Sequence, residues 1–127
     1  MTDKKLLELA LETKKKAYSP YSNFSVGAAL LCENGKVYLG CNIENAAYGE
    51  TICAERVAFF EAVKNGERDF SKIAIVGDSA LCFPCGSCRQ VMAEFCDENF
   101  EIILGEKEKY TLKELLPHSF LKDNLKG

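Results

Sequence analysis

The sequence has no tryptophan, a single histidine and no long apolar run. The one histidine, His118, lies past Pro117 near the end of the chain and is expected to be neither a metal ligand nor a base, so the chemistry must work without it. A membrane-spanning helix needs about 20 consecutive apolar residues, and no such stretch occurs. The first residues, 1–5, also lack the apolar stretch of a secretory signal peptide. We therefore expect a cytoplasmic protein without a membrane partner.

A net positive charge is also lacking, because the formal net charge is -3 and the isoelectric point is about 5.3. Binding to a phosphate backbone calls for a basic surface. The only lysine run, at positions 14–16, ends an amphipathic pattern, where cations favour the helix dipole and usually face solvent. The charge balance therefore favours a small-molecule substrate over nucleic acid.

Cysteine, in contrast, is abundant, with seven residues in a chain of 127. A chain of this length, 47% hydrophobic and 28% charged, suits a single domain spanning residues 1–127. The number of cysteines is odd, the sequence shows no export signal, and several cysteines lie at C-x-x-C spacing. These features argue against a disulfide framework and favour reduced thiols that bind a metal.

Hydrophobic periodicity predicts an alternation of helices and strands. Helices are expected over residues 3–17, 52–64 and 85–96, with a short one from Thr111 to Pro117, and strands over 24–32, 36–44, 73–76, 100–104 and 109–110. Asn34-Gly35 predicts a tight hairpin. Residues 105–108 are too few for a parallel crossover, so the last two strands should be antiparallel. We expect an α/β fold with one mixed five-stranded sheet and helices on its faces.

Two cysteine motifs open predicted helices, Cys53-Ala54-Glu55 and Pro84-Cys85-Gly86-Ser87-Cys88. The positive end of a helix dipole lowers the pKa of a thiol placed there and prepares it for metal. Cys85 and Cys88 share one helical face, and Cys53 can complete a set of three. A structural zinc has four protein ligands, whereas a catalytic zinc has three and a water. The count of three predicts a catalytic zinc site.

Two charged residues next to Cys53 complete this hypothesis. Glu55 can lie beside the open coordination position and move a proton between water and substrate, although it can also simply stabilise the helix dipole. Three thiolates on one zinc leave a net negative charge, which weakens the metal as a Lewis acid. Arg56 can offset this charge by donating to the sulfur of Cys53 or Cys85, its alternative being a surface ion pair.

Cys82 offers a competing interpretation, because it forms a second C-x-x-C unit with Cys85. As a fourth ligand it would close the site and leave a structural zinc module without activity. Pro84 suits the position just before a helix, which leaves Cys82 on the strand side, so we prefer the open site. A thioredoxin-like redox motif fits less well. The remaining cysteines, Cys32, Cys41 and Cys96, are expected in the core.

The sequence C-A-E followed by P-C-G-S-C-R-Q closely resembles the zinc-dependent cytidine deaminase family, in its small homotetrameric branch with three cysteine ligands. Residues 22–30, 40–46 and 115–120 are also similar to the family, so the resemblance covers most of the chain. It implies a three-layer α/β/α fold. It also implies a hydrolase of pyrimidine salvage that converts free cytidine and deoxycytidine to uridine and deoxyuridine and releases ammonia.

The resemblance further implies a role for individual residues. Cys53, Cys85 and Cys88 would hold one zinc ion per subunit, Glu55 would carry protons, and Arg56 would offset the thiolate charge. Substrate contacts would come from Phe24 on the base, Asn42 and Glu44 on the ribose, Ala46 and Ala54 through their backbones, and Phe120 of a neighbouring subunit in a homotetramer, with Tyr48 and Gln90 in supporting positions.

Some of these assignments have alternatives. Asn42 and Glu44 lie two residues apart at a strand end, where side chains share a face, and such a pair suits a sugar diol. Without the resemblance, Phe24 would be interpreted as a core residue. A deaminase acting on RNA or DNA is disfavoured by the acidic charge and the short turn at 105–108. A relative that acts on a cytosine-bearing antibiotic is disfavoured by the pair at positions 42 and 44.

Overall fold

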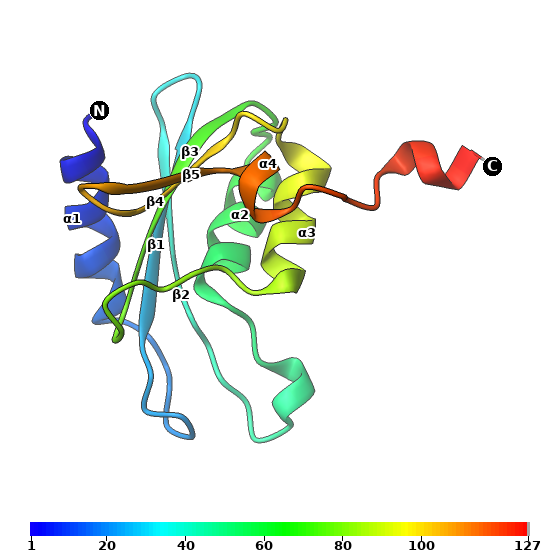
Figure 1. Cartoon of the computed structure of the whole chain (residues 1–127). Coiled ribbons are helices and arrows are strands. Elements are labelled where there is room, and N and C mark those ends of the chain that lie inside the picture. The colour runs from blue at the N-terminus through cyan, green and yellow to red at the C-terminus, as the bar shows by residue number, and fades with distance from the viewer. Residues whose placement is uncertain (127) are drawn as a thin grey trace.

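The computed structural model describes residues 1–126 and contains a five-stranded sheet with helices on both faces (Figure 1). The strands are β1 (Val26–Cys32), β2 (Val37–Cys41), β3 (Phe70–Gly77), β4 (Glu101–Gly105) and β5 (Glu108–Thr111). The helices are α1 (Asp3–Lys14), α2 (Ala54–Lys64), α3 (Gly86–Phe95) and α4 (Leu112–Leu115), with 3-10 turns η1 (Tyr48–Glu50) and η2 (Lys122–Lys126).

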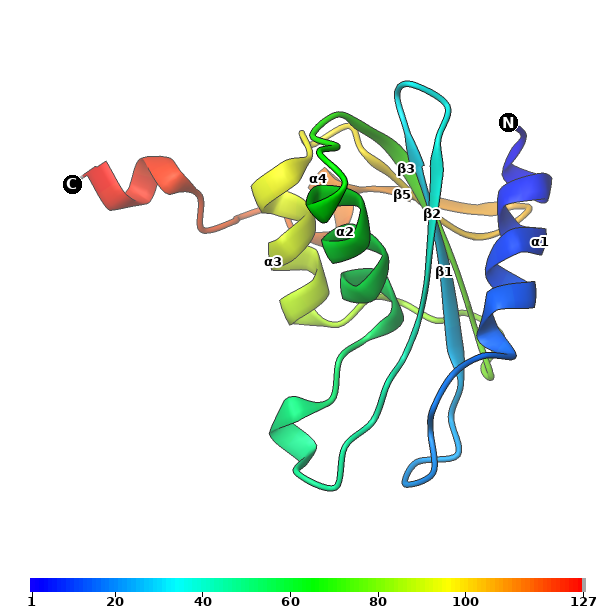
Figure 2. The same ribbon diagram turned by 180° about the vertical axis from the view of Figure 1, so that it is seen from behind.

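The sheet is mixed and has the strand order β2-β1-β3-β4-β5. β1 pairs antiparallel with both β2 and β3, β3 pairs parallel with β4, and β4 pairs antiparallel with β5. α1 covers one face, and α2 and α3 cover the other, as the view from behind also shows (Figure 2). The predicted three-layer α/β/α fold and the antiparallel last pair of strands are confirmed.

The central strand β1 is buried on both faces because successive side chains point to opposite sides. One set, with Ala29 and Leu31, packs against Leu6 and Ala10 of α1. The other set, with Leu30, packs in the core that contains the helices of the opposite face. This explains why β1 is an almost continuous apolar run instead of an alternating one.

Several predicted bounds need correction. The helix expected over 3–17 ends at Lys14, and the strand expected over 36–44 ends at Cys41, so that the residues after it form a loop. The strand expected over 73–76 extends over Phe70–Gly77, since pairing with β1 continues in both directions. The helices expected from 52 and 85 begin one residue after Cys53 and Cys85, which have extended backbone angles and are the N-cap residues.

Two predicted local signals are confirmed. Gly35 has a φ of 90° in the turn between β1 and β2, a conformation that glycine adopts without strain. Thr111 and Glu114 form a capping box, in which the Thr111 hydroxyl accepts from the Glu114 amide at 3.2 Å and the Glu114 carboxylate accepts from the Thr111 amide at 2.9 Å. Of the expected core cysteines, Cys32 is buried, whereas Cys41 and Cys96 are half-buried.

The last of the described residues, up to 126, form a segment that projects from the body of the molecule in both views (Figures 1 and 2). Phe120 lies on this segment with 58% of its surface exposed. Residues 1–126 include no helix with the length and apolar character needed to span a bilayer.

Gly40 lets β2 approach the first turn of α2 very closely. A Cβ atom at this position would lie 2.2 Å from the Ala54 carbonyl oxygen and 2.6 Å from the Ala58 amide nitrogen. We expect Gly40→Ala to lower the free energy of unfolding by about 1–3 kcal/mol, because the helix must move away. Urea titration measures this loss. Gly49→Ala is the control, since a Cβ there meets nothing within 4 Å; equal stability of both variants would contradict the packing argument.

Candidate metal centre and cavity

Three cysteine sulfurs converge at the N-terminal ends of α2 and α3. The Sγ atoms of Cys53 and Cys85 are 3.8 Å apart, those of Cys85 and Cys88 are 3.5 Å apart, and all three lie within 4.8 Å of one another. A tetrahedral zinc with Zn–S bonds of about 2.3 Å places its sulfurs about 3.8 Å apart. The three sulfurs therefore fit a single zinc ion, as their spacing in the sequence predicted.

The local backbone explains why the sulfurs meet. Cys53 and Cys85 occupy N-cap positions, and neither side chain bonds to a backbone amide of its own helix. Their sulfurs therefore remain free for a metal while the positive end of each helix dipole favours the thiolate form. Cys88 lies in the first turn of α3 and is almost fully buried. Two helix ends and one helical turn thus supply the site.

Arg56 contributes positive charge to this cluster. Its Nη2 donates to Cys53 Sγ at 3.4 Å. Hydrogen bonds from the Cys88 thiol and then from Arg56 lower the pKa of Cys53 to about 5, despite partial burial. The same contact with Cys53 raises the pKa of the Cys88 thiol. Three thiols this close cannot all ionise without a cation between them, and a divalent ion provides that compensation.

A second observation also fits a thiolate-rich centre. The Nε atom of Arg56 is buried and has no hydrogen-bond acceptor among residues 1–126. A buried donor without an acceptor is costly, so such groups are rare. Fully ionised sulfurs beside the guanidinium would supply the negative charge that this donor lacks.

Glu55 lies beside the sulfurs with only 4% of its surface exposed. Burial raises the pKa of its carboxyl to about 7, hydrogen bonding to the backbone opposes this shift, and the negative charge of Cys53 adds to it. A carboxyl group with a pKa near neutrality can accept and return a proton under physiological conditions. A carboxylate that only stabilised the helix dipole would have no need of this burial.

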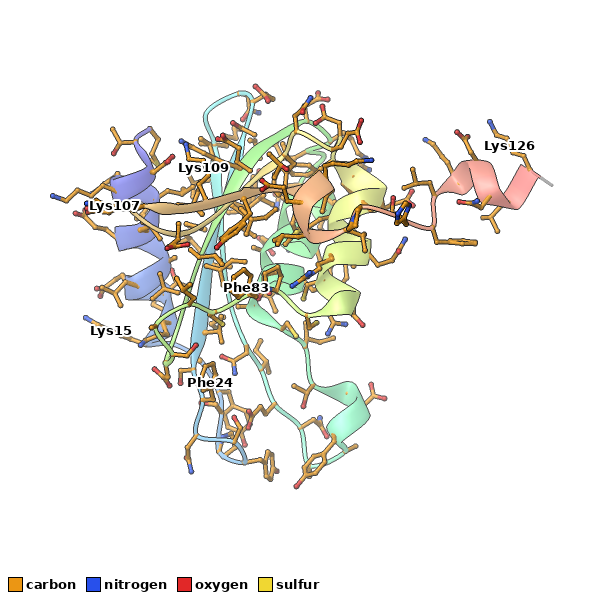
Figure 3. The ribbon with its side chains drawn as sticks, viewed as in Figure 1. Lys15, Phe24, Phe83, Lys107, Lys109 and Lys126 are labelled. Carbon is orange, nitrogen blue, oxygen red and sulfur yellow. The ribbon has the colours of Figure 1, made fainter. Side chains whose placement is uncertain are left out.

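A cavity of about 310 Å³ opens beside Glu55 and the sulfurs of Cys53 and Cys85. Its volume is in the range of small-molecule sites. Phe24, from the segment before β1, and Phe83, from the segment between β3 and α3, both line it and are labelled in Figure 3. Two aromatic rings and a buried carboxyl next to a metal centre suit a flat, polar ring as ligand.

Asn42 and Glu44 also line the cavity and hold the loop that precedes β1. Asn42 Oδ1 accepts from the Val26 amide, and Asn42 Nδ2 donates to the Phe24 carbonyl, both at 2.9 Å. Glu44 accepts from the backbone amides of residues 21 and 22 at 2.9 and 3.1 Å, and from the Ser22 hydroxyl. Each side chain still has hydrogen-bonding capacity for a ligand.

The structure brings most predicted site residues together, but not all. Ala54 lines the cavity, whereas Ala46 and Phe120 are not among the residues that line it in a single chain. Tyr48 is exposed and contacts Tyr21 edge-on, with ring centroids 6.1 Å apart. Gln90 Nε2 donates to the Phe120 carbonyl at 2.6 Å, which ties the start of the projecting segment to α3.

Cys82 is placed in the cavity wall and is not part of the sulfur cluster within residues 1–126. Its side chain packs against the backbone of Gly77. Burial raises the pKa of its thiol to about 11, as expected for a thiol that serves in packing. The arrangement therefore favours the open three-sulfur site over the four-sulfur module.

Four cavity residues received no role from the sequence, Ser22, Val26, Thr51 and Phe83. Ser22 lies in a segment similar to the deaminase family, and that similarity is a signal that it is close to the site. Phe83 precedes Pro84 and carries no motif of its own. Its place depends on how the segment between β3 and α3 folds back over the sheet end, which local sequence does not show.

Comparisons with known proteins agree with this geometry. Residues 1–104 match the family model described as the cytidine and deoxycytidylate deaminase zinc-binding region. A cytidine deaminase of Sporosarcina psychrophila is 48% identical over 130 residues, covering 98% of this chain and 96% of the relative. One of Halalkalibacterium halodurans is 46% identical, covering 94% and 95%.

Solved structures give the same result. A cytidine deaminase from Burkholderia pseudomallei superimposes with a TM-score of 0.89 at 45% identity, covering 94% of this chain and all of that one. One from Mycobacterium tuberculosis has a TM-score of 0.86 at 36% identity, covering 94% and 98%. With its three-sulfur cluster and its buried glutamate at the matching motifs, the chain belongs to the zinc-dependent cytidine and deoxycytidylate deaminase family.

Proposed function

We propose that this protein hydrolytically deaminates free cytidine and deoxycytidine to uridine and deoxyuridine and releases ammonia. The observation that carries the proposal is the three-sulfur cluster, two of whose cysteines line a cavity together with a buried carboxyl group. One zinc ion per subunit, held by Cys53, Cys85 and Cys88, supplies Lewis-acid activation of the water that attacks C4 of the pyrimidine.

Glu55 performs the proton transfers in this proposal. Its carboxylate accepts a proton from the attacking water and passes it to N3 of the ring, and it then delivers the second water proton to the departing amino group, which leaves as ammonia. The raised pKa of Glu55, about 7, supports this role because both protonation states are accessible near neutral pH. Arg56 offsets the thiolate charge through its contact with Cys53.

The substrate is placed by four further residues that line the cavity and by Ala46, which does not line it in a single chain. Phe24 packs against the base, Asn42 and Glu44 bind the ribose hydroxyls, and the backbones of Ala54 and Ala46 contribute polar contacts. Asn42 and Glu44 already fix the loop before β1. Their remaining lone pairs and the second N–H of Asn42 support a role in binding the ribose. The ribose contacts favour a nucleoside over a cytosine-bearing antibiotic.

A homotetramer completes this arrangement. Phe120 is exposed on a segment that projects from the body of one chain, which supports a role for its ring at the cavity of a neighbouring subunit (Figure 1). Tyr48, also exposed, is in a supporting position. We place the enzyme in the cytosol, in pyrimidine salvage, because its seven cysteines are free thiols and its substrates are free nucleosides.

A deaminase of RNA or DNA is the second candidate within the same chemistry. The net charge of -3 disfavours it, because polynucleotide binding depends on phosphate contacts. β4 and β5 are antiparallel and joined by a short turn. The polynucleotide branch instead resembles a parallel arrangement with a helix between these two strands. No nucleic-acid or membrane partner is therefore proposed.

Glu55→Gln should retain zinc and lose turnover of cytidine by about 10²–10⁴-fold, because the amide cannot accept the water proton. Loss of absorbance as cytidine becomes uridine measures the rate, and elemental analysis measures the zinc. Wild-type turnover in a zinc-loaded Glu55→Gln enzyme would contradict the proton-transfer role.

The substrate class can be tested with one enzyme preparation and two substrates. We expect rapid release of ammonia from free cytidine and none from a single-stranded oligonucleotide that contains cytidine. The net charge of -3 and the small cavity of about 310 Å³ are the physical reasons. The opposite pattern would replace the nucleoside assignment with the polynucleotide one.

Cys82→Ser should keep about one zinc ion per subunit, because its sulfur is outside the three-sulfur cluster. Cys88→Ser is the matched variant and should lose most of the zinc. Metal content of both proteins after dialysis against a weak chelator gives the comparison. Release of zinc from Cys82→Ser would support the structural four-sulfur module instead.

A further inference from the structure

Asp78 joins three segments that are distant in the sequence. It directly follows β3, where the chain leaves the sheet toward Cys85. One carboxylate oxygen accepts from Lys14 Nζ, at the end of α1, at 2.7 Å. The other accepts from the backbone amide of Ser25 at 2.7 Å. The carboxylate therefore connects the end of β3 to the segment that carries Phe24.

The end of β3 also contacts the ring of Phe24. A Cβ atom on Gly77 would lie 3.2 Å from Phe24 Cε1 and 2.7 Å from Cys82 Sγ. Ring and thiol thus pack directly on the backbone of Gly77, which has no side chain to displace them. The Gly77 backbone therefore packs against the Phe24 ring, and the Asp78 carboxylate holds the amide of Ser25, the residue after Phe24.

The other bonds of Phe24 involve groups that bind the proposed substrate or support them. Its carbonyl accepts from Asn42, and its amide donates to the Ser22 hydroxyl, which is bound to Glu44. Asp78 is different, because it does not line the cavity. Removing its carboxylate would loosen Phe24 without removing a contact to the substrate.

We infer that Asp78 is a positioning residue for substrate binding, which acts by fixing Phe24 at the cavity wall through the Ser25 amide; the role in binding rests on the proposed function. Phe24 has 36% of its surface exposed, so neighbouring side chains do not enclose its ring. If the ring is ordered only when substrate binds, the free-energy cost of ordering it weakens binding. The ring meets substrate and transition state alike, so its loss raises KM and leaves kcat nearly unchanged.

The test is a double-mutant cycle with Asp78→Ala and Phe24→Ala in the zinc-loaded enzyme, with cytidine as substrate. Each single variant should raise KM about five- to tenfold, with kcat within about twofold and zinc content unchanged. The double variant should resemble Phe24→Ala, because Asp78 acts through that ring. In Asp78→Ala the Ser25 amide should also exchange its hydrogen faster, which is independent of substrate.

Two further variants separate the Ser25 bond from the ion pair. Asp78→Asn keeps an oxygen for the Ser25 amide, so its KM should stay within about twofold of wild type. Asp3→Ala removes ion pairs of α1 with Lys72 and Lys109 at the other end of that helix. It should lower the melting temperature without changing KM.

Several outcomes would overturn the inference. The first two are a KM of Asp78→Ala equal to that of wild type and additive effects of Asp78→Ala and Phe24→Ala on KM. The others are loss of zinc from Asp78→Ala and a KM of Asp78→Asn raised as much as that of Phe24→Ala. The last result also decides the matter if Asp78→Ala does not fold. Failure of the wild-type enzyme to deaminate cytidine would instead overturn the proposed function. Hydrogen exchange of the Ser25 amide would still test whether Asp78 holds this part of the chain.

Discussion

The convergence of two helix N-termini on one point is the constraint on which the site depends. α2 and α3 lie on the same face of the sheet and direct the sulfurs of Cys53, Cys85 and Cys88 to within 4.8 Å of one another (Figure 2). Both helix dipoles favour thiolates there, but three negative charges at this distance repel one another strongly. A divalent cation relieves that repulsion, so metal binding and the local fold stabilise each other.

The surroundings of the sulfurs prepare the site for hydrolysis. Burial gives Glu55 a pKa of about 7, and Arg56 places a positive charge beside the sulfur of Cys53, to which it donates a hydrogen bond. In the cavity wall, Asn42 and Glu44 fix the loop before β1 with part of their hydrogen-bonding capacity and leave the rest for a ligand. The same residues therefore shape the cavity, and in the proposed function they also bind the substrate.

Sequence reasoning predicted the features that depend on local pattern. The three cysteines, the strand alternation and the capping box at Thr111 are set by spacing, and the structure has them as expected. The roles of Phe83 and Asp78 were not found, because they depend on how the segment after β3 crosses the sheet end, a tertiary arrangement without a local signal. The end of the second strand was also misplaced, at residue 44 instead of Cys41, because the apolar Ile43 continues the pattern after pairing with β1 has ended.

The central claim is that three sulfurs hold zinc and one coordination position stays open. X-ray absorption at the zinc edge of the purified enzyme tests this directly. We expect three sulfurs at about 2.3 Å and one oxygen at about 2.0 Å. Four sulfurs around the metal would contradict the claim, because the water needed for hydrolysis would have no place to bind.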